Sequence, residues 1–464
     1  MAQSDAPHVR PPRSSPSRNW WYLGAVFVVL LGLVAVAIPL TVDHEDATGL
    51  LSFPEMAPPS NVAALDGPDA SAPVPTADGL ATALQVLKDK SGKKARVGAS
   101  VLDGLTGDSL ADAQAGDSLA PASSQKLTTT AAALELRGPG YRIPTQVVAG
   151  ADDGDVVLVG AGDVTLSADG HGFYRGSGSL DDLAAQVKKK LGSSPKRLIV
   201  DNSAFTGPDV APGVLKSDVS DGYTARLFPV MLDGGRTDPK GANSPAPRYD
   251  DASVSAAKYL GGKLGVTDIS EGPAPKKSKK LGTVYSPTIE RMVEEALLHS
   301  DNLLTDALGH QAAMAAGNEA SFEGTAKTVK QELSKWGVST EGMTLADGCG
   351  LSGKDRMSAK TLAQVVRVAA DGKHPKISGL FSGLPVAGFS GSLARRFGAG
   401  DAGAGHVRAK TGTLTKVSSL SGMVVDSDGR LLVYSIIING MKSTPAAEAL
   451  LDAASTNLYD CGCK

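Results

Sequence analysis

The sequence predicts an α/β (α+β) fold in which one domain is interrupted by an inserted, β-rich domain. Helical and strand patterns alternate in the first and last thirds of the chain, whereas the middle holds short strand patterns separated by turns. We therefore expect the main domain at residues 81–145 and 285–464, and the inserted domain at residues 146–284.

The first part of the main domain is predicted to contain a helix, a strand and a second helix. Residues 81–90 have apolar side chains at helical spacing, and residues 96–102 alternate as a half-buried strand does. Residues 121–137 begin with a proline and continue as a small, apolar run without glycine, which predicts a helix.

The inserted domain and the rest of the main domain follow the same logic. Short strands at 155–159 and 197–200 flank a predicted helix at 180–191. Four helices are expected next, at residues 288–300, 303–316, 321–335 and 358–370. Strands at 407–410, 420–425 and 431–438 and a last helix from Thr444 complete the pattern, with a hairpin signal at 427–429.

Composition excludes several classes of protein. A chain of 464 residues with 42% hydrophobic and 20% charged residues can bury a large core, which excludes wholesale disorder. The 46 Lys and Arg residues nearly balance 49 Asp and Glu residues, which argues against nucleic-acid binding. Three cysteines are too few for a disulfide scaffold.

An apolar segment near the N-terminus predicts an exported protein. Residues 20–41 carry no charge and are long enough to cross a bilayer as a helix. Arginines precede the segment and acidic residues follow it, so residues 1–19 should be cytoplasmic and the rest extracytoplasmic. The segment is either a transmembrane signal anchor, which its length favours, or a signal peptide cleaved near residues 35–37. Residues 42–80, rich in proline and alanine, are expected to form an extended linker.

Three short motifs indicate the chemistry. Serine acyl enzymes of one type carry S-x-x-K, S-x-N and K-T-G in that order. S-x-x-K occurs at Ser91, Ser123, Ser193 and Ser255, so the surrounding sequence must choose between them. Ser193 has a proline inside its motif, Ser91 lies in a Gly- and Lys-rich turn, and an exposed helix surface explains Ser255.

Ser123 has the setting that the chemistry needs. It stands at the start of the helix predicted from Pro121, so Ser123 and Lys126 share one face about one turn apart. The helix N-terminus there favours negative charge near the serine. Taken alone, Ser123 could also be an ordinary N-cap.

The second and third motifs follow in the required order. Ser300-Asp301-Asn302 comes after the helix predicted over 288–299, and Lys410-Thr411-Gly412-Thr413 continues a strand pattern. Taken singly, the second motif could be a polar cluster at a helix end and the third an ordinary edge strand. The occurrence of all three motifs in order, each in its expected setting, makes coincidence improbable. Glycine at the third motif lets a substrate approach the backbone. The candidate catalytic residues are Ser123, Lys126, Ser300, Asn302 and Lys410, and the candidate substrate-binding residues are Thr411, Gly412 and Thr413.

With these motifs the chain resembles the D-alanyl-D-alanine carboxypeptidase/endopeptidase family, the class C low-molecular-mass penicillin-binding proteins. The resemblance covers about residues 80–460 and is carried by residues 121–127, 160–166, 300–303, 347–352, 384–388 and 408–413. Cys349 stands where the family usually has serine. The resemblance implies the serine penicillin-recognising transpeptidase/β-lactamase-like fold.

The resemblance also implies a reaction. Ser123 would attack the carbonyl of the penultimate D-alanine of a peptidoglycan stem peptide, and water would hydrolyse the acyl-serine. Lys126, desolvated and close to Lys410, would accept the serine proton as a neutral amine. Ser300 would relay that proton to the leaving amine, and Asn302 would hold Lys126 or the substrate amide.

The third motif would bind the substrate. Lys410 would supply positive charge, and the Thr411 and Thr413 hydroxyls would bind the terminal carboxylate. Backbone N–H groups of Ser123 and Thr413 would form the oxyanion hole. Penicillins would acylate the same serine, because they mimic the D-Ala-D-Ala end.

Two other functions remain open at this point. A β-lactamase shares the three motifs, although the chain has no E-x-x-x-N element and carries a long insertion. An inactive wall-binding scaffold would keep the fold without the chemistry. We expect no cofactor or metal, since the sequence has no H-E-x-x-H motif and no P-loop. The balance between carboxypeptidase and endopeptidase activity is left open.

Overall fold

The computed structural model describes residues 69–241, 245–398 and 400–461. The predicted membrane segment at 20–41, the residues before it and most of the linker lie outside these ranges. Among the described residues, no helix has both the length and the apolar character needed to span a bilayer.

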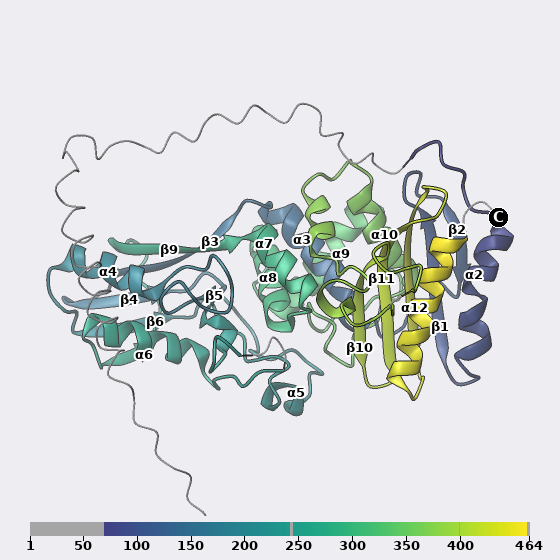
Figure 1. Ribbon diagram of the computed structural model, residues 1–464. Helices are drawn as coiled ribbons and strands as arrows, with labels where there is room; N and C mark the ends of the chain where they lie inside the picture. The colour runs from purple at the N-terminus through teal and green to yellow at the C-terminus, as the bar shows by residue number, and fades with distance from the viewer. Residues whose placement is uncertain (1–68, 242–244, 399, 462–464) are drawn as a thin grey trace, which may run out of the picture. The chain divides into compact units, whose positions relative to one another are not determined.

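A five-stranded antiparallel sheet brings the two ends of the described chain together (Figure 1). Its strand order is β10-β11-β12-β1-β2. The strands are β1 (Arg96–Asp103), β2 (Ser109–Ala113), β10 (Arg408–Leu414), β11 (Val417–Val425) and β12 (Leu431–Asn439). The two predicted strands 420–425 and 431–438 therefore form the expected hairpin.

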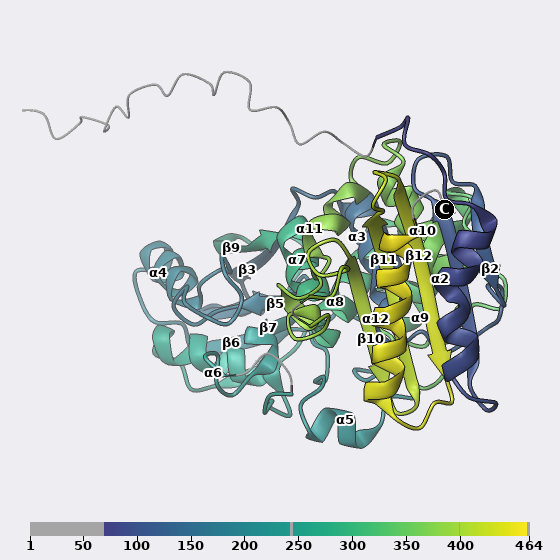
Figure 2. The same ribbon diagram turned by 45° about the vertical axis from the view of Figure 1, so that its right-hand side comes forward.

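Helices cover both faces of this sheet. Helices α2 (Ala77–Lys90) and α12 (Thr444–Asp460) pack on each other and on one face (Figure 2). Helix α10 (Ala359–Ala370) packs on β1 and β12 from the other face. Coverage on both faces explains why β12 is an almost unbroken apolar run, buried from Leu431 through Ile438.

A group of helices packs around α3 (Lys126–Arg137) beside the sheet. The group contains α7 (Ile289–Leu298), α8 (Asn302–Ala315), α9 (Phe322–Lys335) and the short α11 (Leu380–Gly383). The small side chains Ala131, Ala132 and Ala133 of α3 are fully buried, which allows its neighbours to approach closely. The four helices predicted over residues 288–370 are thus confirmed, with ends that differ by one or two residues.

Residues 142–288 form a second five-stranded sheet in the order β8-β6-β4-β3-β9. Its strands are β3 (Arg142–Ala149), β4 (Asp155–Val159), β6 (Arg197–Asp201), β8 (Ile269–Glu271) and β9 (Lys280–Thr288). A smaller sheet pairs β5 (Asp163–Leu166) with β7 (Val230–Leu232). Helices α4 (Leu180–Leu191) and α6 (Ala252–Leu264) pack on these sheets and enclose an apolar core of their own, whereas α5 (Lys216–Ser220) is short and buries no residue.

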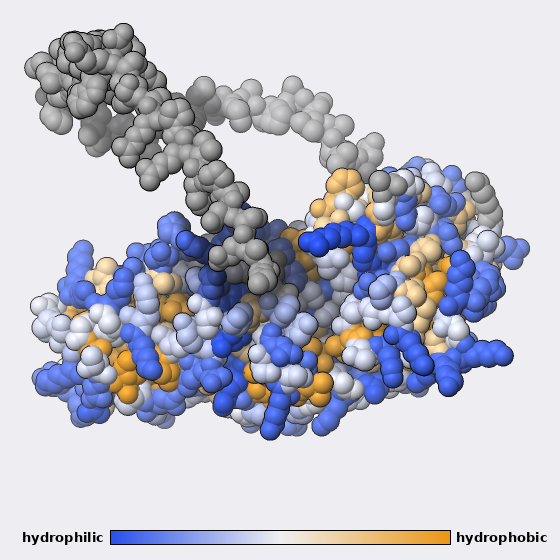
Figure 3. Space-filling model, turned by 60° about the horizontal axis from the view of Figure 1, so that its bottom comes forward, coloured by the Kyte–Doolittle hydropathy of each residue, from blue (hydrophilic) through white to orange (hydrophobic). Residues whose placement is uncertain are grey.

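Polar side chains cover most of the face that is brought forward in Figure 3, and apolar residues show there as separate patches. This distribution is ordinary for a protein surface in contact with water.

Candidate active site

The first motif lies where a tight turn enters α3. The helix predicted from Pro121 begins as a 3-10 turn, η2 (Ala122–Gln125), and the α-helix starts only at Lys126. The Oγ atom of Ser123 lies 2.9 Å from Nζ of Lys126. The turn is tight because Ala122 adopts a left-handed conformation, with φ at +47°.

Lys126 is fully buried and surrounded by oxygen acceptors. Its Nζ donates to Oδ1 of Asn302 at 2.6 Å and to the carbonyl of Cys349 at 2.8 Å. A neutral amine with two N–H bonds can satisfy both acceptors and still present its lone pair to the Ser123 hydroxyl. The geometry therefore suits Lys126 as the base that removes the serine proton.

The second motif lies between two helices. Ser300 follows α7 in a left-handed conformation, with φ at +56°, and Asn302 is the first residue of α8. The Ser300 hydroxyl accepts a hydrogen bond from Nζ of Lys410 at 3.0 Å. Lys410 also donates to the carbonyl of Thr411 at 2.8 Å. Burial, and next the charge of Lys126, hold the pKa of Lys410 well below its usual range.

The third motif lies on β10, at the edge of the main sheet. The hydroxyls of Thr411 and Ser392 lie 2.6 Å apart, and Thr413 donates to the carboxylate of Glu448 at 3.1 Å. An edge strand can accept an extended peptide as an additional strand.

Gly412 is required by the protein as well as by any substrate. A Cβ atom at this position would lie 2.3 Å from Oγ of Ser419 and 3.0 Å from the backbone nitrogen of Ser123. The missing side chain therefore allows β10 to pack against the turn that carries the nucleophile. Ser419 stabilises the same contact, since its hydroxyl donates to the carbonyl of Pro121. The Ser419 hydroxyl also lies 2.8 Å from the Ser124 hydroxyl.

The loop 347–352 supports Lys126 through its backbone. The buried carboxylate of Asp347 accepts the N–H groups of Cys349, Gly350 and Ser352 at 2.9, 2.6 and 2.6 Å. These bonds fix the loop so that the Cys349 carbonyl reaches Lys126. No role for Asp347 was predicted from its motif, although aspartate followed by glycine is typical of a side chain that binds its own turn.

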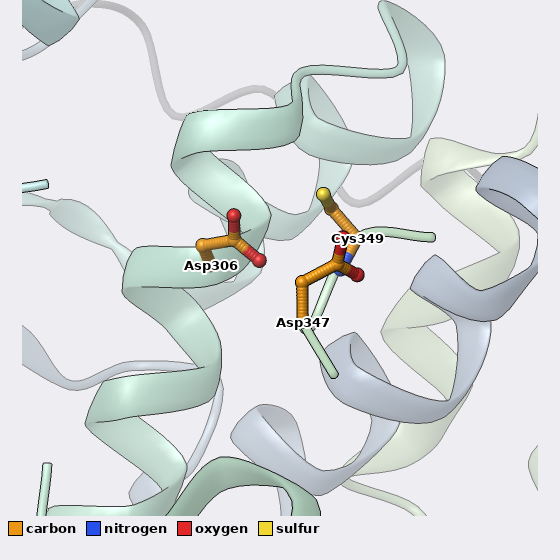
Figure 4. Close-up of side chains that lie close together, drawn as sticks. All are labelled: Asp306, Asp347 and Cys349. Atoms are coloured by element: carbon orange, nitrogen blue, oxygen red, sulfur yellow. The ribbon is translucent and has the colours of Figure 1, made fainter. Parts of the chain in front are cut away.

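Asp347 and Cys349 of this loop form a buried cluster with Asp306 of α8 (Figure 4). Their potential ligand atoms lie within 4.8 Å of one another. Asp306 accepts the N–H of Gly348 at 2.9 Å, and burial, followed by the charge of Asp347, raises its pKa well above the usual range. Burial likewise raises the pKa of the Cys349 thiol. Backbone N–H groups already occupy carboxylate oxygens of Asp306 and Asp347, so the cluster fits a hydrogen-bonded support better than a metal site.

The structure brings all five candidate catalytic residues together through three hydrogen bonds. Lys126 bonds to Ser123 and Asn302, and Lys410 bonds to Ser300. The two sets adjoin through the Ser300-Asp301-Asn302 motif. The other S-x-x-K serines lie elsewhere: Ser91 ends α2, Ser193 follows α4, and Ser255 donates to the carbonyl of Asp251, the N-cap of α6. Sequence reasoning missed Ser392, Ser419 and Asp347. Ser392 and Ser419 bond to other segments, and the loop that Asp347 holds reaches Lys126 only through the fold.

Comparison with known proteins agrees with this geometry. Residues 80–261 and 250–458 match the D-Ala-D-Ala carboxypeptidase 3 (S13) family. The chain belongs to this family. Carboxypeptidase DacB of Mycolicibacterium smegmatis is 37% identical over 98% of this chain and 100% of its own length. Carboxypeptidase Rv3627c of Mycobacterium tuberculosis is 36% identical over 85% of this chain and 86% of its own length.

A solved structure shares the fold of this S13 chain. Penicillin binding protein 4 (dacB) of Haemophilus influenzae superposes with a TM-score of 0.68 at 21% identity. The alignment covers 83% of this chain and 99% of that chain. The mixed α/β fold implied by the motifs is therefore confirmed for the described residues.

Proposed function

We propose that this S13 chain is a serine-type D-Ala-D-Ala carboxypeptidase that acts on peptidoglycan stem peptides. The observation that carries the proposal is the buried group in which Lys126 contacts both Ser123 and Asn302, and Lys410 contacts Ser300. Family membership supplies the substrate class, because the matched family is that of D-Ala-D-Ala carboxypeptidases.

Acylation begins when Lys126, as a neutral amine, takes the proton of the Ser123 hydroxyl. The Ser123 oxygen attacks the carbonyl carbon of the penultimate D-alanine, and the backbone N–H groups of Ser123 and Thr413 bind the oxyanion. Each such donor typically contributes about 100- to 1000-fold in rate. The proton passes through Ser300 to the leaving amine, and the bond to the terminal D-alanine breaks.

Substrate binding and deacylation use the same groups. Lys410 and the hydroxyls of Thr411 and Thr413 bind the terminal carboxylate, and Gly412 keeps the strand close to Ser123. After the terminal D-alanine leaves, a water molecule attacks the acyl-serine and Lys126 accepts its proton. Cleavage of D,D-cross-links would follow the same steps with a larger leaving group.

β-Lactam antibiotics are the second expected ligand class. Penicillin binding protein 4 of Haemophilus influenzae has been solved in complex with a β-lactam, and that structure superposes on this chain with a TM-score of 0.60. A serine that forms an acyl intermediate with D-Ala-D-Ala should also open the lactam ring, which leaves a stable ester on Ser123.

We further propose the placement and division of the chain. Residues 1–19 are cytoplasmic, residues 20–41 anchor the protein in the cell membrane or are cleaved as a signal peptide, and residues 42–80 link them to the extracytoplasmic part. Residues 81–145 and 285–464 form the catalytic domain and residues 146–284 the inserted domain. The support for this division is the second sheet, whose strands all come from residues 142–288. Membrane fractionation and the N-terminal sequence of the mature protein test the anchor.

Fluorescent penicillin and a synthetic pentapeptide test the activity. We expect the wild type to be labelled on Ser123 and to release D-alanine, whereas Ser123→Ala should do neither. Ser255→Ala is the matched control, because Ser255 belongs to a rejected S-x-x-K match and its hydroxyl bonds within its own helix. Rapid turnover of nitrocefin would favour a β-lactamase instead, and an unlabelled but folded wild type would favour a scaffold.

A further inference from the structure

The middle residue of the S-D-N motif is anchored on both of its carboxylate oxygens. Asp301 is 7% exposed and its Oδ1 accepts the N–H of Leu304 at 3.0 Å, which caps α8. Its Oδ2 accepts the hydroxyl of Tyr174 at 2.8 Å and Nη2 of Arg236 at 3.2 Å. Tyr174 and Arg236 belong to the segment between β3 and β9, so that segment reaches directly into a catalytic motif.

The two side chains that hold Asp301 are themselves fixed. Arg236 is buried, stacks 3.5 Å above the ring of Phe173 and donates to the Tyr174 hydroxyl at 3.0 Å. Burial by itself would raise the pKa of Asp301, but the charges of Arg236 and Arg248 lower it to about 2. The carboxylate is therefore ionised at neutral pH and paired inside the protein.

The same segment also contacts the neighbouring motif residue. The side-chain amide of Asn302 donates to the carbonyl of Tyr223 at 3.0 Å, while its oxygen accepts from Lys126. Ser352, at the end of the loop that supports Lys126, donates to the carbonyl of Pro212 at 2.7 Å. Residues 174–236 thus contact the side chains of Asp301 and Asn302 in the second motif and that of Ser352 in the loop 347–352.

The backbone conformation of Ser300 depends on this anchoring of Asp301. The left-handed backbone conformation of Ser300 is unfavourable for a residue with a Cβ, and such a conformation persists only where the surroundings enforce it. Asp301 is the next residue, so a fixed Asp301 side chain prevents the turn from relaxing. The Ser300 hydroxyl then stays on Lys410, and Asn302 stays on Lys126.

We propose that Tyr174 and Arg236 are positioning residues for acylation, which hold Asp301 so that Ser300 and Asn302 stay aligned with the two lysines. The inserted segment then completes the active site. This inference rests on the acyl-serine activity proposed above.

The Tyr174→Phe variant tests the inference, because it removes one hydroxyl and keeps the ring. We expect the rate constant for acylation by fluorescent penicillin to fall about tenfold, since a displacement near 1 Å can cost about 100-fold. The dissociation constant for penicillin and the melting temperature should change little. Tyr259→Phe is the matched control and should acylate as the wild type does, because it removes a 3.0 Å bond to Asp181 on the far side of the same segment.

The same substitution in a Ser300→Ala protein distinguishes positioning of Ser300 from a general loss of stability. In Ser300→Ala, the further change Tyr174→Phe should slow acylation clearly less than it does in the wild type. Arg236→Met is not the primary test, since an unpaired buried Asp301 can prevent folding. The inference is overturned if Tyr174→Phe acylates at the wild-type rate, or if its effect is undiminished in Ser300→Ala. An unlabelled wild type would instead refute the proposed function, and the inference with it.

Discussion

The substitution Gly350→Ala should slow acylation strongly while leaving the protein folded. Gly350 has φ at +83°, and a Cβ atom there would lie 2.0 Å from the carbonyl oxygen of Ala122. Real contacts of this kind begin near 3 Å, so the turn that carries Ser123 must move by about 1 Å, and such a displacement can cost about 100-fold in rate. The left-handed backbone adds about 1–2 kcal/mol of destabilisation.

Stopped-flow acylation with a chromogenic or fluorescent β-lactam measures the effect, with the melting temperature recorded in parallel. Gly353→Ala is the matched control in the same loop, because a Cβ atom there would meet nothing within 4 Å. We expect the control to acylate at nearly the wild-type rate. A folded Gly350→Ala protein that also acylates at that rate would refute the claim that this loop sets the position of Ser123.

Four further predictions concern the two lysines and the cysteine. Asn302→Ala removes the 2.6 Å acceptor of Lys126 and should lower the acylation rate constant about 100-fold in the same assay. Folding lowers the pKa of Lys410 from 10.5, so just below pH 10.5 the unfolded chain binds a proton at Lys410 that the folded protein does not. The stability of the folded protein therefore rises with pH in that window and falls again as the pH is lowered. The free energy of unfolding in urea should therefore gain more between about pH 7 and about pH 9.5 in the wild type than in Lys410→Met; equal gains would contradict the lowered pKa. Cys349→Ser should acylate within a few-fold of the wild type, since Lys126 contacts the backbone carbonyl and not the thiol; a large loss would give the thiol itself a role. The thiol of the native protein should resist Ellman's reagent, since it is buried and its pKa is raised.

Local patterns predicted most helices and strands of the described chain. The helix at residues 180–191 and the hairpin around 427–429 appear as expected, because their periodicity and turn residues are local properties. The start of α3 was misplaced, since the 3-10 turn at Ala122–Gln125 depends on packing against β10 and the loop at Gly350. Helix propensity is a local property of the sequence and therefore does not predict such contacts.

The site was predictable only in part for the same reason. Ser123, Lys126 and Lys410 were found because a fixed spacing or a short motif marks each of them. Ser392 and Ser419 bond to other segments of the chain, whereas Asp347 binds its own loop, and only the fold brings that loop to Lys126. Each of the three looks like an ordinary polar residue in its own segment. Asp301 is the clearest example: it occupies the variable position of its motif, yet Tyr174 and Arg236 bind it.

The placement of β1 has a consequence for biogenesis. This early strand pairs with β12, so that Arg96 lies opposite Asn439, and neither strand can bury its apolar face without the other. A growing polypeptide consequently lacks its central sheet until synthesis has nearly finished, and slow assembly from distant segments is expected. Under the export that we propose from residues 20–41, delayed assembly is an advantage, because an incompletely folded chain remains narrow enough to pass a translocation channel.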